Sequence, residues 1–183
     1  EAGTRLIAEI KDEIMYLESI INAIDIATTE NDLNNIKDEL AVTGYIKRSG
    51  KSKSKGNTHN KPMHYVSSDG FDIYVGKNNI QNDELTFKFA TGGDWWFHAK
   101  QMPGSHVIVK TEGKELPDKT FEEAAALAAY YSKGRDLEKV EVDYVLKKEV
   151  KKPAGAKPGF VVYYTNYSLI AIADISGIRL ISG

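Results

Sequence analysis

The residues best suited to chemistry lie in two neighbouring runs, 94–100 and 103–110. Both tryptophans of the chain stand side by side in the first run, and two of the four histidines are close by. Alternation along a strand predicts two faces for the first run: Trp95, Phe97 and Ala99 inward, and Trp96, His98 and Lys100 outward. An aromatic ring, an imidazole and a cation on one surface suit stacking against a nucleobase beside a phosphate.

The second run is predicted to return antiparallel to the first. Pro103 and Gly104 occupy the central positions of a type II turn, and the residues from His106 to Lys110 again alternate. The two runs therefore predict a β-hairpin with one solvent-exposed face that is basic and aromatic and includes His106. A plainer alternative is that Trp96 packs at the edge of the core, as buried aromatic residues commonly do.

The same residues could also suggest hydrolytic catalysis or metal binding. A hydrolase or nuclease using His98, Ser105 and His106 is one alternative, but no strand-turn-helix elbow surrounds the serine and no carboxylate pair has usable spacing. The histidines, with His59 or His64, lack the spacing of a metal site, and the chain has no cysteine. We therefore expect no enzyme activity, no metal and no cofactor.

Two lysine-rich stretches are candidate contacts for a polyanion. Residues 47–61 hold five lysines and one arginine without an acid, which indicates a mobile linker, a phosphate-contacting tether, or both. Residues 147–159 hold five lysines against one acid in a loop with two prolines and two glycines. We interpret this loop as a clamp on a nucleic-acid backbone, formed by Lys147, Lys148, Lys151, Lys152 and Lys157.

A polar turn follows the strand that ends near Val75. Lys77, Asn78 and Asn79 are suitable donors to phosphate or sugar oxygens, and we place them on the same RNA-binding surface. Asn82 or Asp83 is predicted to cap a short helix over 85–89.

The remaining pattern indicates an α+β fold with a mixed or antiparallel sheet and packed helices. Apolar residues at three- and four-residue steps predict a long amphipathic helix over 6–24, either a surface helix or the end of a coiled-coil arm. A second helix over 33–40 ends at Gly44. A capping box from Thr120 to Glu123 predicts a third helix over 122–133. The other predicted strands are 65–66, 71–75, 140–146, 160–165 and 169–173.

Composition supports one domain with a helical appendage. The net charge of −2 conceals an acidic amino-terminal part, with ten acids and three bases in residues 1–46, and a basic remainder with 21 bases and 16 acids. We expect a helical arm over 1–43, a basic flexible linker over 44–63 and an RNA-binding domain over 64–183. No run is long enough to cross a bilayer, and a cytoplasmic location is expected. The chain starts at Glu1 without a methionine, so we expect it to be part of a longer protein.

Ordered blocks across residues 64–183 resemble the NFACT-R domain, the RNA-binding part of the NFACT family. The blocks are Val75-Gly76-Lys77-Asn78-Asn79, Asp94-Trp95-Trp96-Phe97-His98-Ala99-Lys100, Pro103-Gly104-Ser105-His106-Val107, Val142-Asp143-Tyr144 and Val150-Lys151-Lys152-Pro153. Residues 1–43 resemble the end of the family's coiled-coil arm.

The resemblance implies a function that periodicity does not reveal. Family proteins bind obstructed large ribosomal subunits, recruit tRNA and support carboxyl-terminal tailing of stalled chains. The implied partners are large-subunit rRNA, tRNA and the rest of the full-length chain, including its amino-terminal domain and the other coiled-coil strand. Because bacterial members have been labelled fibronectin-binding protein A-like, an adhesin that binds extracellular matrix is the alternative.

Overall fold

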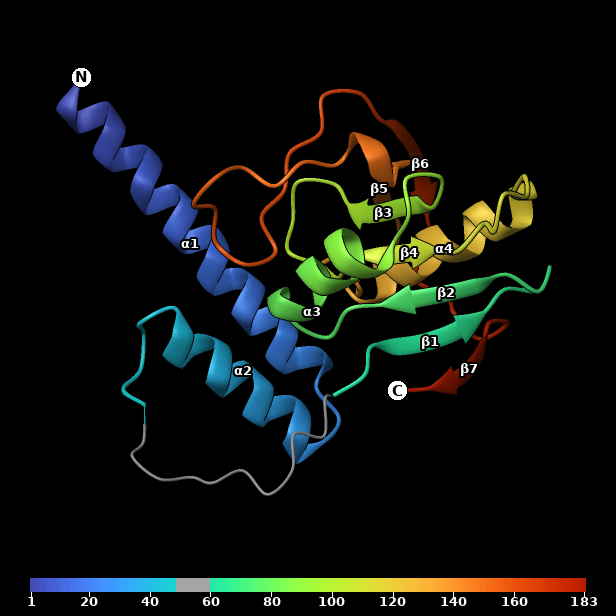
Figure 1. Cartoon of the computed structure of the whole chain (residues 1–183), viewed down its shortest axis with the longest axis horizontal. Helices are drawn as coiled ribbons and strands as arrows, with labels where there is room; N and C mark the ends of the chain where they lie inside the picture. The colour runs from blue at the N-terminus through green and yellow to red at the C-terminus, as the bar shows by residue number, and fades with distance from the viewer. Residues whose placement is uncertain (49–59) are drawn as a thin grey trace.

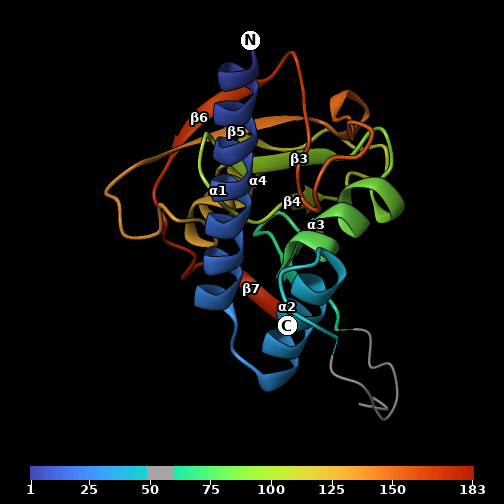
Figure 2. The same ribbon diagram turned by 90° about the vertical axis from the view of Figure 1, so that its left-hand side faces the viewer.

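The computed structural model describes residues 1–48 and 60–183. Residues 49–59, the centre of the predicted basic linker, lie outside the described residues. The fold is α+β, as predicted: two amino-terminal helices precede a seven-stranded sheet with packed helices. Figures 1 and 2 show the long first helix running along one side of the sheet domain, with its amino terminus pointing away.

The two predicted amino-terminal helices are confirmed as an antiparallel pair, α1 (Ala2–Ile26) and α2 (Glu30–Val42). The break between them ends in a capping box, in which the Thr29 hydroxyl accepts from the Asp32 N–H and the Asp32 carboxylate accepts in return. Gly44 follows α2 with a φ of +86°, a conformation that glycine adopts without a steric penalty.

All strand pairs of the sheet are antiparallel, in the order β6-β5-β3-β4-β2-β1-β7. The predicted hairpin of the two central runs is confirmed, with Trp96 opposite Ile108. The strands are β1 (Met63–Val66), β2 (Asp72–Val75), β3 (Trp95–Ala99), β4 (Val107–Val109), β5 (Val140–Leu146), β6 (Tyr167–Ala171) and β7 (Arg179–Ser182).

Both faces of the central strands are covered. The helix α4 (Asp118–Tyr130) packs its alanines on one face, against Phe97 and its neighbours. The opposite face is covered by α3 (Asn79–Glu84), by the π-helical turn η1 (Leu85–Phe89), and by the loop after β5. A sheet buried on both faces leaves neither set of alternating side chains open to solvent at its centre.

Two predicted helix starts are wrong. The short helix is capped by Asn78, whose side chain accepts from the Gln81 N–H, rather than by Asn82 or Asp83. α4 begins at Asp118 without a side-chain cap.

The two residues of the predicted capping box, Thr120 and Glu123, do not cap α4 but contact the turn between β1 and β2. The Thr120 hydroxyl donates to the Asp69 carboxylate and also hydrogen bonds with the Ser67 hydroxyl, and the Glu123 carboxylate accepts from the Ser68 N–H. Tertiary contacts with the β1–β2 turn therefore replace the local capping interaction.

The predicted strand over 160–165 is also wrong. Only Val162 forms a bridge, to Lys151, and the segment instead folds over Trp96 through Val161 and Tyr163. The carboxyl-terminal strand β7, which the sequence analysis missed, pairs with β1 at the far edge of the sheet.

The helical pair is fixed to the sheet domain by buried polar contacts. Glu39 of α2 is fully buried, and its carboxylate accepts from the Tyr16 hydroxyl at 2.7 Å, the Asn79 side-chain amide at 3.1 Å and the Ile80 N–H at 3.4 Å. These donors come from α1 and α3, so one carboxylate connects three helices. A buried carboxylate without such donors would be strongly unfavourable.

A second buried carboxylate, Asp32, lies at the start of α2. It accepts from the Asn60 side chain at 2.6 Å and from the Thr28 N–H at 3.0 Å, and Lys77 Nζ lies 3.4 Å away. Burial acts to raise the pKa of Asp32, but these donors and the lysine charge outweigh it and lower the pKa to about 2.

The opposite side of α1 has no cover among the described residues. Eight large apolar side chains of α1 are exposed, and seven of them, all but Met15, form a stripe: Leu6, Ile7, Ile10, Ile14, Leu17, Ile21 and Ile24. Pairing with another coiled-coil strand stays a prediction. None of the helices in the described ranges is long and apolar enough to cross a membrane.

We predict that Asp32→Asn destabilises the chain in a pH-dependent way. Because the folded-state pKa is lowered, the stabilisation is complete above pH 4 and is lost as the pH falls towards 2. The free energy of unfolding should therefore fall by about 2 kcal/mol at pH 7, with a smaller loss near pH 2. Urea unfolding measures this, with Asp38→Asn on the exposed side of α2 as control. An equal loss at both pH values would contradict the prediction.

We predict that Gly159→Ala is more damaging than Gly113→Ala. Both glycines have positive φ, at +81° and +78°, so both substitutions carry the backbone cost. A Cβ at Gly159 would also lie 3.0 Å from the Asn79 Cβ, whereas a Cβ at Gly113 would meet nothing within 4 Å. The additional loss at Gly159 should be about 1–3 kcal/mol in urea unfolding. Equal losses would show that the loop yields to the new side chain.

Candidate functional site

Trp96 and His106 do not form the predicted stacking surface. Trp96 is 1% exposed and packs with Ile108, Val145 and Tyr163 in a second hydrophobic core, on the face of the sheet covered by η1 and the loop after β5. His106 is also 1% exposed; its Nδ1 hydrogen bonds with the Thr86 hydroxyl at 2.8 Å and its Nε2 with the Gly159 carbonyl at 3.1 Å. The two-face burial of the sheet overturns the exposure that alternation predicted.

His98 and Lys100 are half-buried at the other end of the strand. The His98 ring stacks in parallel on Trp96, with centroids 5.6 Å apart, and its Nε2 lies 3.2 Å from the Gly104 carbonyl. Burial lowers the pKa of His98, and burial together with the nearby His98 charge lowers the pKa of His106 further. Lys100 Nζ donates to Glu141 at 2.9 Å, so its charge is already paired.

The polar turn after β2 is not an open phosphate site. Lys77, Asn78 and Asn79 are all buried, and each bonds inside the chain. Lys77 reaches Asp32, Asn78 caps α3, and Asn79 donates to Ser19 and Glu39. These side chains attach the helical pair to the domain, which explains why donors of this type stand at this turn.

The arrangement of His98, Ser105 and His106 does not match a nucleophile with its base. Ser105 is buried, and both ring nitrogens of His106 are engaged by Thr86 and Gly159. Within residues 1–48 and 60–183, no group of three or more metal-ligating side chains is arranged to hold an ion.

The five lysines of the predicted clamp divide into two groups. Lys152 Nζ pairs with Asp83 at 3.0 Å and donates to the Lys157 and Phe160 carbonyls, and Lys157 Nζ lies over the rings of Tyr16 and Tyr45. These two hold the loop in place. Lys148 and Lys151 are exposed and Lys147 is half-exposed, around the 3-10 turn η2 (Lys147–Glu149).

Further residues missed by the sequence analysis join these exposed lysines. The Lys147 N–H bonds to the Asp94 carbonyl and the Lys148 N–H to the Gly92 carbonyl, which brings η2 beside the loop that follows η1. Lys110 Nζ, which is paired with the buried Asp94 carboxylate, lies 4.9 Å from the ring centroid of Phe89, a residue that is 43% exposed. Lys147 Nζ lies 5.9 Å from the ring centroid of Phe87. We define the basic aromatic patch as Phe87, Lys88, Phe89, Lys110, Lys147, Lys148 and Lys151.

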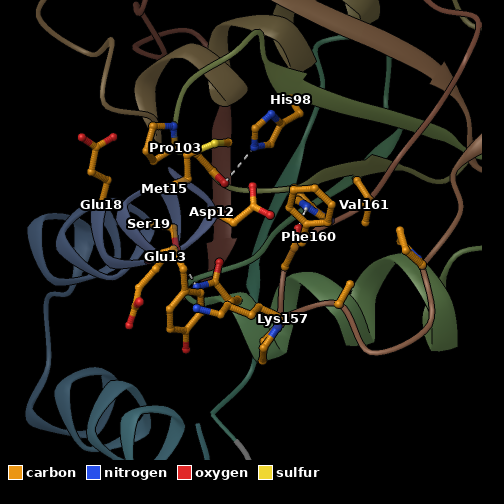
Figure 3. Close-up of a pocket in the computed structure, with 18 of the residues that line it drawn as sticks. Asp12, Glu13, Met15, Glu18, Ser19, His98, Pro103, Lys157, Phe160 and Val161 are labelled. Atoms are coloured by element: carbon orange, nitrogen blue, oxygen red, sulfur yellow. Dashed lines mark hydrogen bonds between the residues drawn. The ribbon is translucent and has the colours of Figure 1, made fainter. Parts of the chain in front are cut away.

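A pocket of about 760 Å³ lies on the other side of the loop after β5, between that loop and α1. Its wall contains five of the predicted site residues, Asn79, Trp96, His98, His106 and Lys157, together with acidic side chains of α1. Figure 3 shows Asp12 pointing from α1 into the pocket, between His98 and Phe160. Five of the twelve predicted residues are thus gathered at a concave site rather than on an open surface.

Comparison with known families divides the chain where the basic linker lies. Residues 61–165 match the family described as NFACT protein RNA binding domain, and residues 1–59 match the NFACT N-terminal and middle domains. The first match alone covers more than half of the chain.

Similar proteins include bacterial and animal relatives. The chain is 47% identical to the Rqc2 homolog RqcH of Streptococcus suis over 161 residues, covering 87% of this chain and 28% of that protein. It is 39% identical to the Rqc2 homolog RqcH of Bacillus subtilis over 166 residues, covering 90% and 29%. The chain therefore spans less than a third of the length of these curated relatives.

A solved structure has the same fold. It is the C-terminal part of the fibronectin/fibrinogen-binding protein of Streptococcus suis, with a TM-score of 0.87 and 43% identity. The likeness covers 95% of this chain and 69% of the other. Since the family match, the sequence identity and the fold agree, this chain belongs to the NFACT protein family.

Proposed function

We propose that the chain is the RNA-contacting part of a ribosome quality-control factor. In the full-length protein it contacts rRNA and tRNA on obstructed large ribosomal subunits, and it supports carboxyl-terminal tailing of stalled chains. The match to an RNA binding domain and the likeness to relatives named Rqc2 homolog RqcH support this proposal.

The basic aromatic patch is the observation that carries the proposal. It places cations beside partly exposed aromatic rings on one surface, and this combination suits a sugar-phosphate backbone with an unpaired base. Lys147, Lys148 and Lys151, which were predicted from the sequence, supply the part of the contact that is independent of base sequence. Phe89, a residue that is 43% exposed, supplies a stacking surface in place of the buried Trp96.

We predict that replacing Lys147, Lys148 and Lys151 by alanine weakens binding to structured RNA. Each lost phosphate contact should reduce the slope of log affinity against log salt by about 0.9. Fluorescence anisotropy across a salt series measures both the affinity and the slope.

A matched control removes the same charge elsewhere. Lys37, Lys119 and Lys139 are exposed on α2, on α4 and before β5, and their replacement by alanine should change the slope little. Equal effects of the two triple variants would mean that the patch is not the contact surface. Wild-type affinity that does not respond to salt would contradict RNA binding through lysines altogether.

The adhesin is the second candidate, because the solved relative is titled a fibronectin/fibrinogen-binding protein. The edge strand β6 exposes Tyr167 and Ile170, and an extended peptide can add to such an edge. As an adhesin, the chain would bind immobilised fibronectin in a saturable way, and Ile170→Lys would weaken this binding. If binding does not saturate, or if soluble RNA abolishes it through the lysines, the adhesin proposal fails.

A further inference from the structure

The pocket between α1 and the sheet has the chemistry of a cation site. We propose that it binds the side chain of an arginine presented by a basic peptide partner. This site is separate from the basic aromatic patch and does not depend on RNA binding.

The size and walls of the pocket suit one long side chain with part of its backbone. Its volume of about 760 Å³ lies within the range of ligand sites. Three segments form the walls: the middle of α1, the turn between β3 and β4, and the loop after β5. Met15, Met102 and Pro103 contribute apolar surface for the methylene groups of an arginine.

Aromatic rings provide flat surfaces for a guanidinium. The half-buried His98 ring lies parallel to the buried Trp96 ring behind it, with an interplanar angle of 8°, and the half-buried Tyr163 ring lies 5.1 Å from Trp96. Phe160, which is 41% exposed, stands at the same pocket. A planar, weakly hydrated guanidinium stacks on such rings more favourably than a compact ammonium does.

Carboxylates on α1 provide the opposite charge. Asp12 points into the pocket, and Glu9, Glu13 and Glu18 stand along the same wall. Glu9 is paired with Arg5, Glu13 accepts from the Tyr45 hydroxyl, and Glu18 lies 3.6 Å from Lys133 Nζ. Asp12 is exposed and forms no hydrogen bond or ion pair with any other described residue. It is therefore the carboxylate placed to receive the ligand.

The groups facing these carboxylates do not cancel their charge. Burial lowers the pKa of His98 and of His106 and so disfavours their charged forms, and Lys157 is the one lysine in the described pocket wall. Because Arg5 pairs with Glu9 and Lys133 with Glu18, Asp12 and Glu13 remain against Lys157, and this excess of negative charge disfavours a phosphate. The charge therefore selects a cationic peptide.

Trp96 gives an independent indication of a ligand. Its indole N–H is buried and has no hydrogen-bond partner within the described part of the chain, although Trp96 belongs to the pocket wall. Buried donors are nearly always paired. A carbonyl oxygen of the bound peptide would supply an acceptor if it entered beside this ring.

The two indole N–H signals of the 183-residue chain provide a direct test. Trp95→Phe leaves the signal of Trp96 as the remaining indole signal in a ¹H–¹⁵N spectrum. We expect this signal to shift in a saturable way with acetyl-Ala-Arg-Ala-amide. The same tripeptide with lysine in place of arginine should bind more weakly. The tripeptide with citrulline, which has the shape of arginine without its charge, should not bind.

Variants separate the pocket from general electrostatics. Asp12→Asn should lower the affinity for the arginine peptide by about tenfold, because a charge-assisted hydrogen bond is lost. Glu122→Gln, an exposed acid on α4, should leave the affinity unchanged. The proposal is overturned if no peptide shifts the signal, if citrulline binds as well as arginine, if both variants behave alike, or if RNA rather than peptide produces the shift.

Discussion

The buried carboxylate of Glu39 is the contact on which the arrangement of this chain depends. It accepts hydrogen bonds from Tyr16 of α1, from Asn79 and from the backbone of Ile80, so it connects the helical pair to the sheet domain. Removing one of these donors leaves a fully buried carboxylate with fewer hydrogen bonds, which is costly. Together with the ion pair of Asp32 and Lys77, it fixes the position of α1 against the domain.

The fixed position of α1 separates two surfaces of opposite charge. On one side, the acidic wall of α1 closes a pocket over Trp96 and His98. On the other side, lysines and phenylalanines gather where η1, β4 and the end of β5 meet. The loop after β5 contributes to both surfaces, because Lys151 lies in the patch and Phe160 lines the pocket. A net charge of −2 therefore describes neither surface.

Sequence patterns predicted the elements well where local signals act alone. The 3.6-residue periodicity of α1, the glycine after α2 and the alternation of β3 each correspond to the structure. Local signals failed where tertiary partners compete. Thr120 and Glu123 have the spacing of a capping box, but the β1–β2 turn offers them better-placed partners. Residues 160–165 have the composition of a strand, but they fold over the second core.

For the candidate site, the sequence predicted which residues could contact a nucleic acid, but it did not determine which way they face. The paired tryptophans, the polar turn and the lysine loop were all identified, as was the family that their order resembles. Only the tertiary structure decided that Trp96, His106 and Lys77 are buried and that Lys148 and Lys151 are exposed. The physical reason is that alternation assigns side chains to two faces of a strand, whereas burial depends on what covers each face. Here α4 covers one face, and α3, η1 and the loop after β5 cover the other.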